Sequence, residues 1–288
     1  MDARISSWCY RGSHVLGDAI DMLMPALRAT ERDLADVLVR QLCTTAHLSS
    51  ESVLLLTMRD RAWGVEMIVR SVAESTVKAV CIDLAREEQR QAVAEDFWYA
   101  GLAIAHLKDD ARLLRFLEKV ENPDSPMWRP YRERMLADEE REDVESTYPP
   151  KERKEHERRW SFRELCQKLG ASGNAAYEHL AQTAYLYSVS SHVLHSDAFA
   201  VAVAADRWRR SDEERQALEA AHAARLICDV ISFAFARVSA IGGRRSLDPE
   251  QVTAWSQRAV ALMDDTAVAH REFHNVIYNE AKGTLDPS

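Results

Sequence analysis

Three observations predict an all-α fold, a bundle of long antiparallel helices. Turn-forming residues are scarce, since the 288-residue chain holds only 9 glycines and 8 prolines, and an all-β or α/β protein of this length normally needs more. Ala, Leu, Arg and Glu dominate the composition, and all four are strong helix formers. Apolar residues recur at helical spacing along long stretches, as in helices that bury one face in a bundle.

The N-terminal part of the chain is expected to form four helices. Two amphipathic patterns cover 14–28 and 31–46, and Pro25 should kink or end the first of them. A longer apolar helix should follow over about 49–85. A fourth helix should cover roughly 87–119.

The segment 121–160 differs in composition and is predicted to be a charged helical-hairpin insertion. Acidic residues dominate its first part, basic residues dominate 151–163, and Pro149-Pro150 separates the two. Two explanations stay open at this point. The oppositely charged helices pair with each other in solvent, or the basic strip binds RNA or another acidic partner.

Three more helices are expected in the C-terminal part, over about 175–206, 211–241 and 248–282. Ser211 and Glu214 have the spacing of a capping box at the start of the second of these. We interpret the whole chain, 1–288, as a single helical domain.

Composition also limits the classes of function. A net charge of −9 disfavours broad binding to nucleic acid, because an acidic surface repels phosphate. No apolar run predicts a membrane span, and the N-terminal residues lack the apolar core of a signal peptide. Five widely spaced cysteines without a C-x-x-C pair indicate reduced thiols. We therefore expect a cytoplasmic protein that does not associate with membranes.

Arg70 and Glu74 form the first candidate constellation. They are four residues apart within an apolar helical stretch and so share one face of the helix. Burying either charge alone is costly, so the two should be paired or bound to something. The pair is either an ion pair that fixes helix register or part of a site.

Ser191 and His195 form the second constellation, again four residues apart, in a stretch that is polar between apolar flanks. This pattern predicts a polar layer inside the bundle. Histidine is suited to acid–base chemistry near neutral pH. The alternative is a core histidine with satisfied hydrogen bonds, next to small serines that let another helix approach.

These motifs, in this order, resemble a family of bacterial helical proteins of unknown function, over roughly residues 45–240. The matching residues are Arg70, Glu74, Trp160, Ser161, Gly170, Tyr187, Ser191 and His195. The chain is also similar to the helical HEPN group, whose members are often metal-independent ribonucleases in toxin–antitoxin and phage-defence systems. Those enzymes carry an Arg followed within two helical turns by a His. Here that pattern occurs as Arg40–His47 and Arg215–His222, away from both polar constellations.

Motifs for other chemistries are missing from the sequence. It contains no phosphate-binding G-x-x-x-x-G-K-[ST] loop, no G-x-G-x-x-G, no G-x-S-x-G and no pair of E-x-x-H motifs. His270 and His274 have the spacing of two metal ligands, but no third ligand is identifiable, which favours a solvent-facing helix. We therefore expect no cofactor and no metal.

The sequence leads to one structural expectation and two functional hypotheses. Arg70, Glu74, Ser191 and His195 are expected to form one polar cluster. In the first hypothesis it is the active site of a defence or toxin endoribonuclease, with His195 as general acid–base and Arg70 opposite the phosphate. In the second it is structural, and the protein is an interaction or sensor module. A homodimer or higher oligomer is expected in either case, with RNA or another protein as a possible partner.

Overall fold

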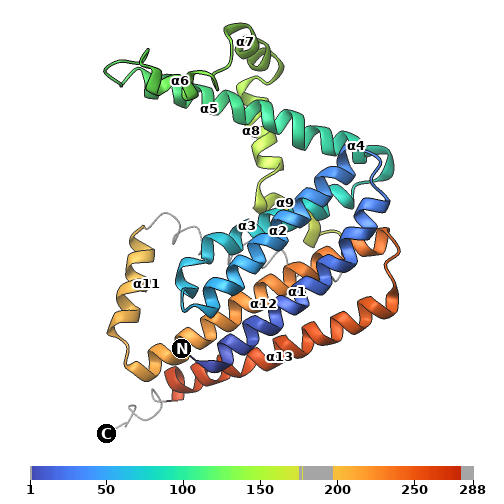
Figure 1. Ribbon diagram of the computed structural model, residues 1–288, viewed down its shortest axis with the longest axis vertical. Coiled ribbons are helices and arrows are strands. Elements are labelled where there is room, and N and C mark those ends of the chain that lie inside the picture. The colour runs from blue at the N-terminus through green and yellow to red at the C-terminus, as the bar shows by residue number, and fades with distance from the viewer. Residues whose placement is uncertain (1, 175–176, 178–196, 280–288) are drawn as a thin grey trace.

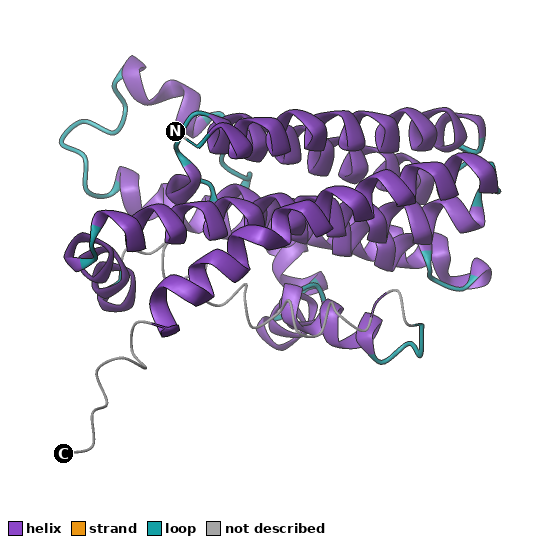
Figure 2. Cartoon of the chain, turned by 90° about the horizontal axis from the view of Figure 1, so that it is seen from below, coloured by secondary structure: helices purple, strands orange, loops and turns teal. Residues whose placement is uncertain are grey.

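The structure, a computed structural model, describes residues 2–174, 177 and 197–279. Over these residues it contains helices and no strand, which confirms the predicted all-α fold. Five long helices form the bundle, lying roughly alongside one another (Figures 1 and 2). They are α1 (Ala3–Ala29), α2 (Leu34–Met58), α3 (Glu66–Asp83), α12 (Asp212–Arg244) and α13 (Pro249–Asn279).

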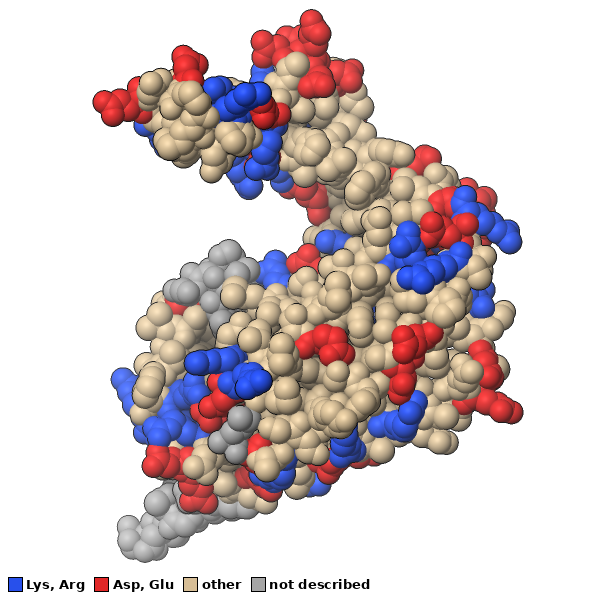
Figure 3. Space-filling model, viewed as in Figure 1, with Lys and Arg blue, Asp and Glu red and all other residues tan. Residues whose placement is uncertain are grey.

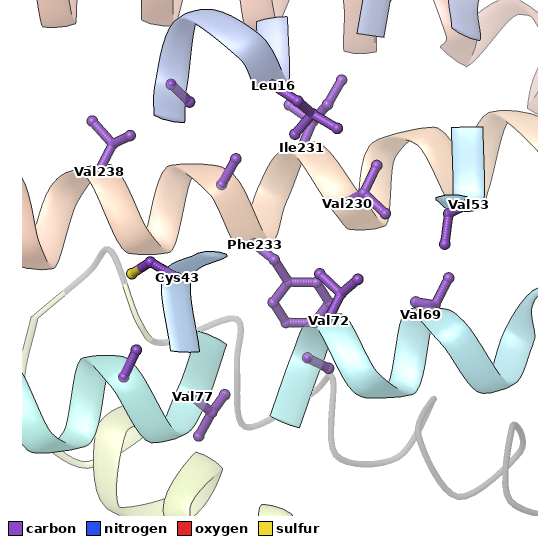
Figure 4. Packing of buried hydrophobic residues seen from close by; sticks show 14 of the residues in the cluster. Leu16, Cys43, Val53, Val69, Val72, Val77, Val230, Ile231, Phe233 and Val238 are labelled. Carbon is purple, nitrogen blue, oxygen red and sulfur yellow. The ribbon is translucent and has the colours of Figure 1, made fainter. Parts of the chain in front are cut away.

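Helix α12 is the central helix of the bundle and contacts the other four. It begins at the predicted capping box, in which the Ser211 and Glu214 side chains each accept a backbone N–H bond of the other residue. Ile231 and Phe233 are buried in its middle, and Phe233 points toward Val72 of α3 (Figure 4). By length and composition α12 could cross a membrane, but 67% of its most apolar stretch is buried in the bundle. Most of this stretch is therefore covered by the other helices.

Two N-terminal predictions need correction. Of the two effects expected of Pro25, a kink or an end of the helix, the second is excluded, because Pro25 lies inside α1, which continues to Ala29. The helix expected over 49–85 is broken, because α2 ends at Met58 and α3 begins at Glu66. Asp60 in this turn adopts a left-handed conformation with φ 61°. The chain then passes through the short helix η1 (Ala62–Gly64) before α3.

Helix α4 (Glu87–Glu95) follows α3 and packs on α2 and α3, and a projecting arm leaves the bundle after it (Figure 1). The outgoing part of the arm consists of the π-helical turn η2 (Asp96–Ala100) and α5 (Gly101–Leu117). Its returning part consists of η3 (Pro126–Trp128), α6 (Arg129–Arg132), α7 (Asp138–Thr147) and α8 (Pro150–Arg159). Helix α9 (Phe162–Gly170) then packs on α3, and α11 (Ala198–Arg209) leads into α12.

The predicted charged insertion forms the returning part of this arm. The acidic helix α7 and the basic helix α8 follow each other across Pro149, but no ion pair joins them in the described structure. Each is attached to α5 instead: Arg141 of α7 bonds to Asp110 at 2.7 Å, and Glu157 of α8 bonds to Lys108 at 2.5 Å. The mutual pairing considered from the sequence is therefore not found.

The arm starts and ends at one place, which we call the arm root. Asp96 accepts a hydrogen bond from Trp160 Nε1 at 2.7 Å and pairs with Arg159 at 3.0 Å. The imidazole Nε2 of buried His156 lies 3.0 Å from the backbone oxygen of Asp96. These bonds join the first residue of η2 to α8 and its C-cap, so the two ends of the arm are fixed together.

A buried ring of charges closes the bundle near the arm root. Asp36 of α2 bonds to Arg90 at 2.7 Å and to Arg245 at 3.0 Å. Asp83, the last residue of α3, bonds to the same two guanidinium groups at 3.3 and 2.6 Å. All four side chains are at most 7% exposed. The alternating charges neutralise each other, and together they connect α2, α3, α4 and the end of α12.

Candidate functional site

The structure describes two of the four predicted site residues. Ser191 and His195 lie outside the described residues, so the proposed four-residue cluster is not tested. Arg70 and Glu74 lie on α3 and form the expected pair, with Arg70 Nε 3.2 Å from Glu74 Oε1. Lys78 lies one turn further on, with its Nζ 3.2 Å from Glu74 Oε2.

These three residues belong to a longer row of alternating charges on α3. Glu66, Arg70, Glu74 and Lys78 follow one another at four-residue spacing and therefore share one face of the helix. The side chains of Arg70, Glu74 and Lys78 are 26%, 30% and 23% exposed, whereas most other residues of α3 are buried. The row is thus open to its surroundings along most of its length, and not a sealed ion pair in the core.

Glu66 connects this row to a second polar cluster on α12. Its carboxylate bonds to the guanidinium of Arg225 and lies 3.5 Å from Nε2 of His222. Arg225 also pairs with Asp229 at 2.8 Å. His222, Arg225 and Asp229 lie three and four residues apart, so they form one polar stripe on a helix that is otherwise mostly apolar.

Trp63 of η1 covers this cluster. Its ring stacks on the imidazole of His222, with the ring centres 4.2 Å apart and an interplanar angle of 11°. The guanidinium of Arg207 in α11 lies 4.8 Å from the centre of the Trp63 ring and also bonds to Glu219 of α12. The stack therefore attaches α11 and η1 to the central helix.

The cluster shifts two pKa values in opposite directions. Burial, with the neighbouring guanidinium of Arg225, lowers the pKa of His222 to about 4, although the Glu66 carboxylate opposes this. Burial also raises the pKa of Asp229 to about 6, against the effect of its bond to Arg225. At neutral pH the imidazole of His222 is therefore uncharged.

Two atoms of the cluster are buried without a hydrogen-bond partner, Nε1 of Trp63 and Nε2 of His222. The indole N–H can only donate, and the imidazole nitrogen can donate or accept, depending on its tautomer. Glu66, Arg225 and Asp229 bond mainly to one another, so they stabilise the junction of α3 and α12. The cluster is thus a structural junction in which two buried nitrogen atoms lack a hydrogen-bond partner.

None of the motifs considered from the sequence predicts this cluster. Arg215–His222 was considered only as one motif, and the structure does not support that motif, because Arg215 pairs with Asp212 at the exposed start of α12. The spacing of His222, Arg225 and Asp229, three and four residues apart in an otherwise apolar stretch, is the sequence signal that could have revealed the cluster. Among the described residues, no group of three His, Cys, Asp or Glu side chains could hold a metal ion.

The arm presents a different kind of surface. It carries several large apolar side chains that are 38–65% exposed, and Figure 3 shows the arm standing clear of the bundle. They are Trp98, Tyr99, Leu102, Phe116, Met127 and Tyr131. Near the far end, Phe116, Trp128 and Tyr131 contact one another, with ring centres 5.2–5.8 Å apart. These contacts hold the tip in shape while leaving apolar surface exposed.

Comparison with known proteins gives a family but no activity. The model of a family of unknown function, DUF5677, matches residues 36–214, a range that includes the α3 row and the whole arm. No curated protein and no solved structure is significantly similar to the chain. The resemblance to a helical family of unknown function is thereby confirmed, and the chain belongs to the DUF5677 family.

Proposed function

We propose that the protein is a non-enzymatic interaction module and that the arm is its binding surface. The observation that supports this is the exposed apolar surface of the arm, above all Met127, which is 65% exposed, and Tyr131, which is 41% exposed. Exposed apolar side chains gathered on one projection favour binding to another macromolecule, because burying them removes apolar surface from water.

The arm is also built to hold this surface in a fixed position. The arm root joins α8 to η2 through three polar contacts of Asp96. The ion pairs of Arg141 and Glu157 hold the returning helices against α5. A surface that is already ordered loses less conformational entropy on binding than a flexible segment does.

Site-specific photo-crosslinking in cells tests this function. A photoreactive phenylalanine analogue at Met127 should form discrete adducts. The same analogue at exposed Gln257 of α13 serves as the matched control. Replacing Tyr131 by Ser should weaken the Met127 adducts and leave the folded fraction unchanged. Equal labelling at both positions, or none at Met127, would contradict an interaction surface on the arm.

A second candidate function is supported by the open row on α3. An endoribonuclease of a toxin or phage-defence system, similar to the HEPN group, would use Arg70 to stabilise the developing phosphate charge. His195 would act as general acid–base, with Glu74 and Ser191 orienting the two. The supporting observation is that the side chains of Arg70 and Glu74 are 26% and 30% exposed, so a substrate could reach both charged groups.

A growth assay distinguishes the two functions. Wild type and His195→Ala are induced at matched soluble levels, and total RNA is examined on a gel. Toxicity with cleaved RNA, lost in the variant, would support the nuclease. Intact RNA and normal growth with both proteins would favour the interaction module over the nuclease. For either function we propose the cytoplasm, supported by five cysteines that are all free.

A further inference from the structure

The acidic helix of the arm, α7, exposes carboxylates that no cation neutralises. Arg141 attaches this helix to α5. Glu139 and Asp143 lie on the side of the helix opposite Arg141, and Glu142 lies about 100° from Arg141, given a rotation of about 100° per residue along a helix. All three are exposed, and in the described structure none has an ion pair. Figure 3 shows acidic side chains gathered over α7, at the top of the view.

The basic helix α8 is the counterpart. Its buried residue is His156, which faces the arm root. Lys151 and Lys154 lie on the opposite side of the helix and are exposed. Neither lysine takes part in an ion pair in the part of the chain that the structure describes. One chain thus presents an unpaired acidic face and an unpaired basic face on successive helices of equal length, ten residues each.

The two faces cannot neutralise each other within one chain while both helices are fixed to α5. The inward side chains of α7 and α8 are already engaged by Asp110 and Lys108. The charged faces therefore point outward, toward a partner. A partner that offers both an acidic and a basic helix at the same relative position is a second copy of the same arm.

We propose that the arm binds the arm of a second copy, with α7 of each chain against α8 of the other. Such a contact is self-complementary, so it closes into a two-fold dimer in which each acidic–basic contact occurs twice. The exposed side chains of Met127 and Tyr131 lie on the same arm and offer additional apolar surface. This inference rests on the proposed function and names its partner.

Charge reversal followed by sedimentation equilibrium tests the dimer. The α7-reversed variant is Glu139→Lys/Glu142→Lys, and the α8-reversed variant is Lys151→Glu/Lys154→Glu. Wild type should sediment at twice the chain mass of 32.7 kDa. Each variant should raise the dimer dissociation constant on the order of 100-fold, because like charges then face each other. The matched control, Glu250→Lys/Asp264→Lys on α13, makes the same charge change as the α7 variant away from the arm and should stay dimeric.

Mixing the two reversed variants is the decisive step. In a mixed pair every acidic helix again faces a basic one, so a heterodimer should form although neither variant dimerises alone. Pairing within one chain cannot produce this rescue. Circular dichroism confirms that both variants remain folded before they are mixed. Raising the salt concentration from 0.1 to about 1 M should weaken the wild-type dimer, since the Debye length falls from about 10 to 3 Å.

Three results would overturn the dimer: a monomeric wild type, a dimer that neither reversal weakens, or no heterodimer on mixing. A monomeric wild type whose basic helix shifts an RNA probe would assign α8 to nucleic acid instead. The proposed function fails separately. If wild type is monomeric but Met127 still cross-links to another protein, the arm remains an interaction surface and only the second copy is excluded.

Discussion

Removing one member of the buried charge ring should destabilise the protein more than removing any surface ion pair. Asp83→Ala deletes a fully buried carboxylate that bonds to Arg245 at 2.6 Å and to Arg90 at 3.3 Å. Both guanidinium groups are at most 5% exposed, and Asp36 then remains as the buried carboxylate between them. Asp33 still pairs with Arg90 at 3.3 Å, but its side chain is 38% exposed. Two buried guanidinium groups therefore share one buried carboxylate in place of two.

The size of the effect follows from these contacts. Breaking a buried ion pair by removing one partner costs about 3–5 kcal/mol, because an uncompensated charge is left behind. Asp83 Oδ2 has no hydrogen-bond partner, so its loss removes one unfavourable feature. We therefore expect the lower end, ~3 kcal/mol. With a urea m-value of roughly 2–3 kcal/mol/M, the unfolding midpoint should fall by about 1–1.5 M.

Urea unfolding followed by circular dichroism at 222 nm measures this change. Glu87→Ala is the matched control, because Glu87 pairs with Arg244 beside the ring but is 81% exposed. An exposed pair of this kind contributes little, so the control should unfold close to wild type. If Asp83→Ala and Glu87→Ala unfold at the same urea concentration, the ring does not fix this end of the bundle.

Three further predictions concern the polar cluster, the core and the arm root. Because burial raises the pKa of Asp229 to about 6, the contribution of Asp229 to the free energy of unfolding should fall as pH rises from about 4 to 6. His222, whose pKa is lowered to about 4, contributes a rise over the same range. Asp229→Asn should therefore increase the gain in the free energy of unfolding between pH 4 and 7 by about 1–2 kcal/mol relative to wild type, after allowing for the 25% exposure of the side chain. Parallel urea curves for the two proteins at pH 4 and 7 would contradict it. Phe233→Ala should lower the free energy of unfolding by about 3–5 kcal/mol, because its ring is buried where α12 packs on α3. Urea unfolding measures this loss. A loss below about 1 kcal/mol would mean that neighbouring side chains fill the cavity left by the ring. Trp160→Phe keeps an aromatic ring but loses the hydrogen bond to Asp96. Backbone amide hydrogen exchange should therefore become faster in the arm and stay unchanged in α12. Equal exchange rates in the arm of wild type and variant would show that this bond does not hold the arm.

Helical periodicity was sufficient to predict the fold class, because each long helix buries one face and the pattern is visible in the sequence alone. The prolines before and after the acidic segment also indicated the charged part of the arm. Local exceptions were not predictable in the same way. Pro25 lies inside α1, four residues before its end, and the local rule for proline does not say whether the helix is kinked or ends there. The break between Met58 and Glu66 depends on a turn that includes left-handed Asp60.

The candidate site was predicted only as far as contacts along one helix allow. Arg70 and Glu74 pair because they are four residues apart, and the sequence contains that information. Glu66 and His222 come together from distant parts of the chain, through the packing of α3 on α12. Three-dimensional packing of this kind is not encoded in any short motif. The polar stripe on α12 could have been noticed, but its partner on α3 could not.

The bond between Asp96 and Trp160 makes the arm a modular unit of the chain. The polypeptide leaves and re-enters the bundle at two residues whose side chains are hydrogen-bonded, so the residues between them form a closed loop. The entropic cost of closing such a loop grows only with the logarithm of its length, so the loop can become longer or shorter with little loss of stability in the rest of the protein. Evolution can therefore exchange the arm while conserving the bundle, and an engineer can replace it by a short linker between the same two positions.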